Sequence, residues 1–185
     1  MAAWKPDRGK ADRMPLFHRD ILQHQLRAVL FYWGWLPSLV LGTGLLLDWV
    51  LKLPSLPLPI LLWITAAILG TVGLLFISWS TRDLERYGNG TPSPLKPARQ
   101  LIRQGSYRLC RHPMFFGYNL LMLAALLALR SPAGLVCCYP LYLLWSIRFL
   151  RKEEQNLAVR FKDIFQQYRQ QVPFLIPRIP GNEHD

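Results

Sequence analysis

The sequence predicts an all-α integral membrane protein with about four transmembrane helices and an amphipathic cytoplasmic helix at its C-terminus. Three observations support this fold class. The chain has 185 residues, 51% of them apolar, and the apolar residues gather in long runs between charged stretches. Lys and Arg are concentrated in alternate connections between these runs. After residue 150, apolar side chains recur at helical spacing. A single membrane domain over 1–185 is the simplest organisation.

The distribution of basic residues predicts how the chain crosses the membrane. The net charge is +11, and of the 22 Lys and Arg residues six precede the first apolar run, seven lie between Arg82 and Arg111, and seven follow from Arg148 onward. Because segments rich in Lys and Arg resist translocation, the N-terminus, the central loop and the C-terminus are expected in the cytoplasm. The basic surface then faces anionic lipid headgroups, and the charge gives no support for nucleic-acid binding.

The first half of the chain is expected to contain a leader and two spans. Residues 1–27 form a charged cytoplasmic leader, because they lack the short apolar core and the cleavage site of a signal peptide. The first span covers 28–50, and a turn rich in prolines leads to the second span at 58–79. Small residues in these spans would let another helix approach closely. They are Gly34, Gly42 and Gly44 in the first span and Gly70 and Gly73 in the second.

Residues 80–112 are expected to form a cytoplasmic loop. Turn formers and prolines are frequent after Tyr87, which favours a structured loop over a helix there. The sequence Gly88-Asn89-Gly90 lacks both the GxGxxG spacing and the preceding strand of a dinucleotide-binding fingerprint. We therefore expect no Rossmann fold, and a nucleotide-like cofactor would be held in another way.

The second half is expected to form a helical hairpin followed by a C-terminal helix. The third span covers 113–129, and its connection to the fourth span at 133–150 is so short that the two helices run back beside each other. Pro140 interrupts the fourth span and predicts a kink, which in membrane helices commonly borders a cavity. Residues 151–185 contain an amphipathic helix and a tail.

The stretch Gly105–Asn119 gathers basic and aromatic residues just before the third span. Proline favours the first turn of a helix, so His112-Pro113 predicts that a helix begins here. The unpaired N–H groups of a helix start and the charges of Arg108 and Arg111 suit a carboxylate or a phosphate. The alternatives are that the arginines anchor the chain to headgroups and that His112 is only a helix cap. A flat aromatic set adjoins this cluster: Tyr107, Phe115, Phe116 and Tyr118.

An acidic pair, Glu153-Glu154, directly follows the fourth span. At about 100° per residue, Glu153 lies about 40° to one side of Leu157 and Glu154 about 60° to the other, so both carboxylates flank an apolar face. A carboxylate in this position requires a cation or hydrogen-bond donors. Two antiparallel helices would return the pair to the same membrane face as His112. The alternative is that the pair only balances neighbouring basic residues at the headgroups.

The three cysteines give no sign of a metal or disulfide site. Cys137 and Cys138 are adjacent within an apolar run and are expected to be small buried hydrophobes. Cys110 beside His112 supplies too few ligands for zinc. We therefore expect no metal.

Two segments resemble a known group of membrane enzymes. GSYRLCRHPMFFG, followed after the hairpin by LRKEEQNLAVRFKDIFQQYRQQVPFLIP, is similar to the C-terminal half of the isoprenylcysteine carboxyl methyltransferase and phospholipid methyltransferase families. The resemblance runs from about Gly88 to Pro177. The chain departs from the family pattern in places: Ser106 replaces a proline, Phe115 a tyrosine and Lys162 a glycine.

The resemblance implies a methyltransferase that uses S-adenosylmethionine and acts on a lipophilic acceptor at the cytoplasmic side of a membrane. The acceptor would resemble an isoprenylcysteine carboxylate or a phospholipid. Glu153 and Glu154 would supply an essential acidic pair, and Glu154 and His112 are the candidates for catalysis. The residues implied in cofactor binding are Tyr107, Arg111, His112, Pro113, Tyr118, Glu153 and Glu154.

Two other functions remain open. The same pattern resembles the C-terminal part of membrane sterol and steroid reductases, which use NADPH and are generally longer. A non-catalytic membrane subunit would keep the fold for packing alone. The expected partners are a lipophilic or lipid-modified substrate and membrane lipids, without nucleic acid, and the short loops favour a bacterial inner membrane as the location.

Overall fold

A computed structural model of the chain describes residues 34–88 and 100–178. This part of the chain is all-helical and contains no strand, so it has no Rossmann fold, as predicted. The leader at 1–27, the start of the first span and most of the turn-rich loop lie outside the described residues. The elements are α2 (Leu36–Val50), α3 (Pro59–Gly88), the short 3-10 helix η3 (Gly105–Arg108), α4 (Pro113–Ala128), the π-helical turn η4 (Gly134–Cys138) and α5 (Tyr139–Gln171).

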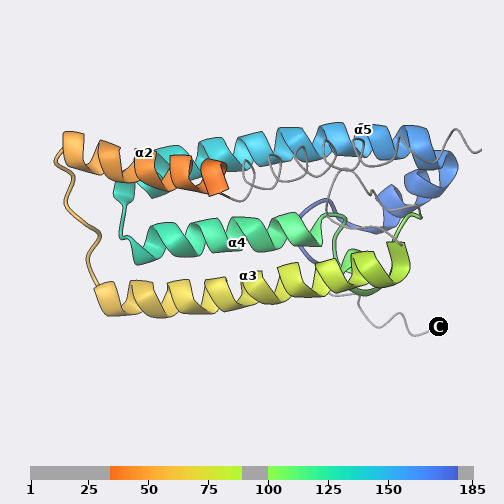
Figure 1. The fold of residues 1–185 in the computed structure, drawn as a ribbon, viewed down its shortest axis with the longest axis horizontal. Helices are drawn as coiled ribbons and strands as arrows, with labels where there is room; N and C mark the ends of the chain where they lie inside the picture. The colour runs from red at the N-terminus through yellow and green to blue at the C-terminus, as the bar shows by residue number, and fades with distance from the viewer. Residues whose placement is uncertain (1–33, 89–99, 179–185) are drawn as a thin grey trace, which may run out of the picture.

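The four long helices lie side by side and alternate in direction (Figure 1). α4 packs against α3 along its length, and α2 packs against η4. The connections from α2 to α3 and from α4 to η4 lie together at one end of the bundle, which we call the turn end (Figure 1). The connection from α3 to α4 and the distal part of α5 lie at the opposite end, the loop end. Segments far apart in sequence therefore meet at the loop end.

Two pairs of glycines allow close packing between helices. A Cβ added at Gly73 would lie 2.8 Å from the carbonyl oxygen of Gly117, and one added at Gly44 would lie 2.8 Å from the Cα of Gly134. The backbones are therefore in direct contact, which any larger side chain would prevent. The predicted packing role of Gly44 and Gly73 is confirmed. Within the described part of the chain, the other predicted glycines have ordinary contacts or none: Gly34, Gly42 and Gly70.

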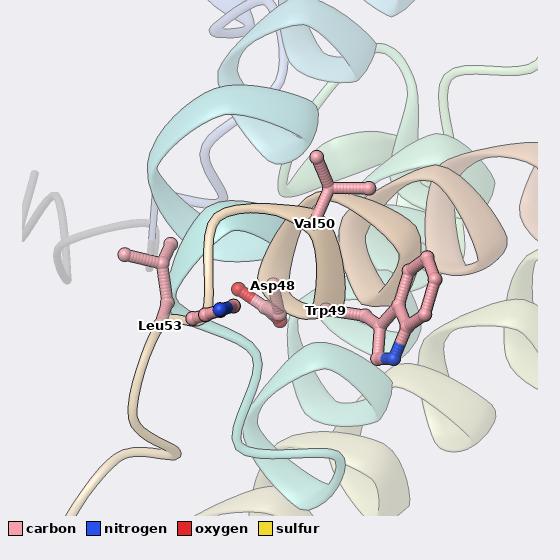
Figure 2. Close-up of a pocket in the computed structure, with 5 residues that line it drawn as sticks. Asp48, Trp49, Val50 and Leu53 are labelled. Atoms are coloured by element: carbon pink, nitrogen blue, oxygen red, sulfur yellow. The ribbon is translucent and has the colours of Figure 1, made fainter.

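Polar groups join the two connections at the turn end. Asp48 on α2 accepts a hydrogen bond from the backbone N–H of Ala133 at 2.9 Å. Arg130 donates through Nε to the carbonyl oxygen of Leu56 at 2.7 Å, and its own carbonyl accepts from the Leu56 N–H. A cavity of about 610 Å³ opens here (Figure 2). It is lined by Asp48, Trp49, Val50, Lys52 and Leu53.

Two helices extend past the predicted ends of their spans. α3 continues to Gly88, although the second span was expected to end at 79. α5 continues to Gln171, so the fourth span and the amphipathic helix form one element with no break at 150. The apolar runs mark the limits of hydrophobic surface, whereas Leu, Arg, Glu, Lys and Gln all favour continued helix. The helices therefore do not end at these two boundaries, residues 80–88 are helix and not loop, and the membrane limits at 79 and 150 remain predictions.

The predicted kink at Pro140 takes a different form. Pro140 stands in the first turn of α5, and the π-helical turn Gly134–Cys138 comes immediately before it. Proline has no N–H to offer the carbonyl four residues earlier, and its ring crowds that carbonyl. A π-helical turn widens the helix at this point, so the backbone accommodates the proline ring. The irregularity lies before the proline.

One described helix, α3, is long and apolar enough to cross a membrane, and α2 and α4 are shorter apolar helices. Large apolar side chains cover the outside of α3, an arrangement that is costly in water and favourable in lipid. Those exposed on α3 are Ile60, Leu61, Trp63, Ile64, Ile68, Leu74, Leu75, Trp79 and Tyr87. Four membrane spans remain a prediction.

Lys162 has a backbone conformation that favours glycine. Its φ of 43° and ψ of −122° interrupt α5, and α5 changes direction near its end (Figure 1). A side chain is strained here, by about 1–3 kcal/mol, because its Cβ crowds the backbone. Position 162 is also one at which the chain differs from the methyltransferase families that it resembles, because their pattern has glycine there.

We expect Lys162→Gly to raise the free energy of unfolding by about 1 kcal/mol, because the relief of strain exceeds the added entropy of the unfolded chain. Thermal melting in detergent measures the change. The control is Asp163→Gly, one residue further along, where glycine in a helical position should lower stability by about 1 kcal/mol. Equal losses in the two variants would contradict the prediction.

Candidate functional site

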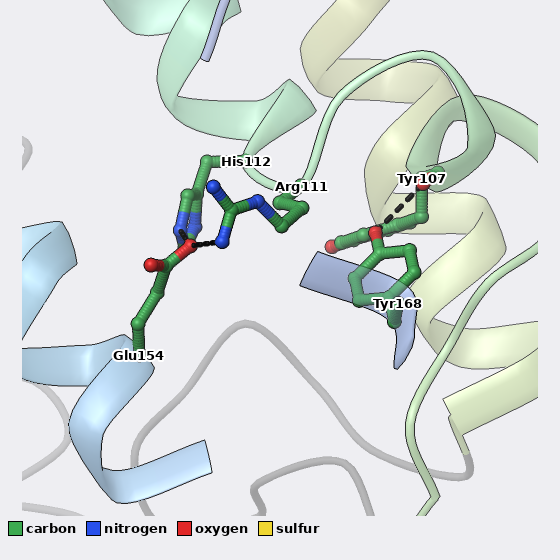
Figure 3. A network of polar contacts seen from close by, with 5 residues as sticks. All are labelled: Tyr107, Arg111, His112, Glu154 and Tyr168. Carbon is green, nitrogen blue, oxygen red and sulfur yellow. Dashed lines mark hydrogen bonds and ion pairs between the residues drawn. The ribbon is translucent and has the colours of Figure 1, made fainter. Parts of the chain in front are cut away.

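The loop end carries the predicted basic cluster and the predicted acidic pair. α4 begins at Pro113, as predicted, and His112 is its N-cap residue by backbone position. The His112 side chain makes no capping hydrogen bond to the helix. Instead its Nε2 lies 3.2 Å from Oε1 of Glu154 on α5 (Figure 3). The His112 side chain therefore does not cap the helix, and the alternative that His112 is only a helix cap is wrong for the side chain.

Arg111 completes this contact. Its Nη1 lies 2.6 Å from the same Oε1 of Glu154. The side chains of Arg111, His112 and Glu154 are only 10%, 7% and 9% exposed. We call these three residues the acid–base cluster. It joins the start of α4 to α5 across 42 residues of sequence.

The charges in the acid–base cluster stabilise one another. Burial opposes ionisation of Glu154, but the hydrogen bond from His112 and the charge of Arg111 outweigh it and place the carboxyl pKa below its usual value. Burial lowers the pKa of Arg111, and the carboxylate of Glu154 opposes this shift. Glu154 is therefore ionised at neutral pH.

The segment after α5 covers this cluster. Residues 172–178, which we call the C-terminal strap, run beside the loop before α4. The backbone N–H of Arg111 donates to the carbonyl of Pro173, and that of Arg178 donates to the carbonyl of Leu109, each at 2.9 Å. The ring of Phe174 lies 5.4 Å from the Arg111 guanidinium and meets the His112 ring edge to face at 5.1 Å. One wall of the cluster is therefore aromatic.

Two tyrosines link the loop to the distal part of α5. Tyr168 is 3% exposed and donates its hydroxyl proton to the carbonyl of Tyr107 at 2.7 Å (Figure 3). Burial is the largest cause that raises the pKa of both phenols, so both are neutral. Phe165 and Tyr168, which follow the change of direction in α5 at Lys162, are both buried.

Other predicted site residues make no hydrogen bond or ion pair within the acid–base cluster that the structure describes. Pro113 is buried in the first turn of α4. Glu153 is exposed, beside Glu154 on α5. Tyr118 lies further along α4 and packs edge to face on Phe115, with ring centroids 5.7 Å apart. Arg108 is exposed, which suits the alternative role of a headgroup anchor.

Four residues that sequence reasoning did not select help to shape the site. Asp83 on α3 binds the start of the loop, and Ser106 is its partner. Tyr168 and Phe174 contact the loop from the C-terminal side. Phe174 could have been selected from the sequence, because it lies in VPFLIP, the last part of the segment that resembles the methyltransferase families. No local pattern marked Asp83, because its partner lies 23 residues away.

The described residues contain no group of three His, Cys, Asp or Glu side chains that could hold a metal ion. Cys110 is fully buried, and burial raises the pKa of its thiol to about 12. The thiol is therefore protonated at neutral pH and is a poor nucleophile.

The acid–base cluster presents both signs of charge in a buried place. Among the described residues, Nε of Arg111 is buried and has no hydrogen-bond partner. A buried guanidinium donor of this kind suits a carboxylate, and a buried carboxylate suits an ammonium or hydroxyl group. The arrangement fits a ligand that carries both an acidic and a basic group.

Comparison with known proteins identifies a family to which the chain is similar. A family model described as phospholipid methyltransferase matches residues 61–164. The matched range includes nearly all of α3, the whole of α4, and α5 as far as Ile164, and so contains the whole acid–base cluster. No curated protein and no protein of solved structure matches the chain.

Proposed function

Because this chain belongs to the phospholipid methyltransferase family, we propose that it transfers a methyl group from S-adenosylmethionine to a lipophilic acceptor at the cytoplasmic face of a membrane. The family implies a methyltransferase that acts on lipid-like substrates. The observation that carries the finer proposal is the contact of Arg111 and His112 with Glu154, at the end of a bundle with an apolar outer surface.

The residues of the acid–base cluster fit this cofactor. S-adenosylmethionine carries a carboxylate and an ammonium group, and when bound it supplies a methyl group activated by a sulfonium. The free Nε of Arg111 would bind the carboxylate, and Glu154 would bind the ammonium or a ribose hydroxyl. The other residues proposed to line the cofactor site are Tyr107, His112, Pro113, Tyr118 and Glu153.

Methyl transfer needs an aligned acceptor and the exclusion of water. The buried positions of His112 and Glu154 support the second requirement. A carboxylate or thiolate acceptor requires no base, whereas an amine must lose a proton. The bond to the ionised Glu154 needs a proton on Nε2 of His112, which leaves Nδ1 as the accepting nitrogen of the neutral ring. His112, oriented by Glu154, is therefore our proposed base for an amine acceptor.

The placement of the site supports a cytoplasmic location. The loop end holds both the α3–α4 connection and the C-terminal strap, and an even number of spans would put the N-terminus there too (Figure 1). Many basic residues belong to the last turns of α3, to the loop before α4 and to the part of α5 after residue 150: Arg82, Arg86, Arg103, Arg108, Arg151, Lys152, Arg160 and Arg169. We propose four spans, with this end in the cytoplasm of a bacterial inner membrane.

The family match favours methyl transfer over the NADPH-dependent reductase that the sequence left open. It leaves the third possibility, a non-catalytic subunit, to experiment. Ligand binding separates all three, because a ligand that binds only the folded state raises the melting temperature.

S-adenosylhomocysteine, the product form of the cofactor, is expected to stabilise the purified protein. At about 100 times the dissociation constant it should add about 2.7 kcal/mol. For a chain of this size this corresponds to a rise of roughly 5–10 °C in melting temperature. The measurement is thermal unfolding in detergent, with NADPH as the matched ligand control. Stabilisation by NADPH alone would support the reductase, and no shift with either ligand would support a non-catalytic subunit.

A further inference from the structure

A carboxyl group on α3 binds the start of the loop that carries the site. Asp83 is 5% exposed, and its Oδ2 accepts hydrogen bonds from both the backbone N–H and the hydroxyl of Ser106, each at 2.7 Å. Ser106 is fully buried in the first turn of η3. The mechanism proposed above makes no use of Asp83.

The backbone is shaped for this contact. Gly105 has a φ of +61°, a left-handed conformation that glycine adopts without strain. A Cβ on Gly105 would lie only 2.3 Å from Oδ2 of Asp83, so no other residue fits without displacing the carboxyl group. Two independent features, the conformation and the close approach, therefore make the Asp83 contact specific to this position.

Asp83 holds the loop from the side opposite to α5. The other hydrogen bonds to the loop described above come from Glu154, Tyr168 and the C-terminal strap, all on or after α5. Asp83 lies on α3, and α3 is packed against α4 through Gly73. Within the part of the chain that the structure describes, Asp83 thus fixes the loop to the α3–α4 pair.

We propose that Asp83 is a positioning residue for the cofactor site. It acts through Ser106 and sets where Tyr107, Arg111 and His112 stand relative to Glu154. Oδ2 of Asp83 accepts both hydrogen bonds from Ser106, and the proposal assigns Asp83 no contact with the reacting atoms. The inference rests on the proposed function, because it assigns Asp83 a role in binding S-adenosylmethionine.

The test compares Asp83→Leu, Asp83→Asn and wild-type protein in binding to S-adenosylhomocysteine. Leu removes the hydrogen-bond acceptor of Ser106, so the loop can shift. A displacement of about 1 Å at a site residue can lower an enzyme's rate about 100-fold. We expect the dissociation constant to rise at least about tenfold for Leu. Asn keeps an acceptor oxygen in the same place, so a change of only about twofold to threefold is expected. Glu85→Leu, at an exposed carboxyl on the same helix, is the control and should bind as wild type.

Kinetics distinguish positioning from a purely structural role. Displaced binding groups raise KM for S-adenosylmethionine, and kcat at saturating cofactor falls only as far as the displacement also moves His112. A loss of folded protein lowers kcat and leaves KM unchanged, and that result would overturn the proposal. If Asp83→Leu does not fold, Ser106→Ala takes its place in the test, because it removes the hydroxyl donor to Asp83. Binding of S-adenosylhomocysteine by Ser106→Ala with the wild-type dissociation constant would then overturn the proposal.

The outcomes also separate this inference from the function on which it rests. If wild-type protein binds S-adenosylhomocysteine and Asp83→Leu binds it equally well, the inference fails and the proposed function stands. If the wild-type protein itself does not bind, the proposed function fails first, and the role of Asp83 fails with it.

Discussion

A Glu154→Gln variant is expected to remain folded, although less stable because the buried Arg111 loses its anionic partner, and to lose methyl transfer by about 100-fold or more. The amide has the same shape as the carboxyl group and still accepts a hydrogen bond from Nε2 of His112. It lacks the negative charge that would bind the cofactor's ammonium group and support a proton on His112. Loss of acid–base assistance alone costs about 10²–10⁴ in rate. The measurement is transfer of label from radiolabelled S-adenosylmethionine into extracted lipid.

A matched control tests whether the loss is specific to this carboxyl group. Asp163→Asn removes an exposed carboxyl group from the same helix and should leave transfer unchanged. The rate of methyl transfer by Glu153→Gln is expected to lie between those of Glu154→Gln and Asp163→Asn, because Glu153 belongs to the acidic pair but is exposed. Transfer at the wild-type rate by folded Glu154→Gln would contradict the proposed role of Glu154.

The sequence allowed the main features of the loop end to be predicted. The length of the apolar runs and the short connection at Arg130 predicted a hairpin, and Pro113 predicted the start of α4. These signals are local, because helix periodicity and proline act within a few residues. The hairpin then determines that residues before α4 and after the apolar part of α5 lie at the same end. The topology thus places His112 and Glu154 at the same end, and the structure shows that their side chains are in contact there.

Other features depend on contacts that no local pattern reveals. The hydrogen bond from Tyr168 to Tyr107 crosses 61 residues, and the bonds from Ser106 to Asp83 cross 23. The departure from the family pattern at Ser106 was visible, but its reason was not. A proline there would have neither the N–H nor the hydroxyl that Asp83 accepts. Such a departure becomes understandable only when the residue opposite is known.

The acid–base cluster also has a consequence for ligand binding. Arg111 and Glu154 are the proposed partners of the cofactor's carboxylate and ammonium groups, and without a ligand they pair with each other. Binding the cofactor would replace part of this contact by contacts of the same kind, so neither charge is left buried alone. The pair thus has two roles that experiments can separate: stability and recognition.

Arg111→Leu is expected to destabilise the protein strongly, because it leaves the buried carboxylate of Glu154 with His112 as its remaining partner. Breaking a buried ion pair on one side costs about 3–5 kcal/mol. This corresponds to a fall of roughly 6–20 °C in melting temperature for a chain of this size. Thermal unfolding in detergent without ligand measures it.

The double variant Arg111→Leu with Glu154→Leu separates the two roles. Replacing both members of a buried pair by apolar side chains is often neutral or stabilising, so the double variant should melt within a few degrees of wild type. It should nevertheless fail to bind S-adenosylhomocysteine, since both proposed partners of the ligand are gone. A double variant as unstable as the single variant would mean that the packing of the two side chains, and not their charge, holds the loop end together. Ligand binding by the double variant would contradict the proposed cofactor contacts.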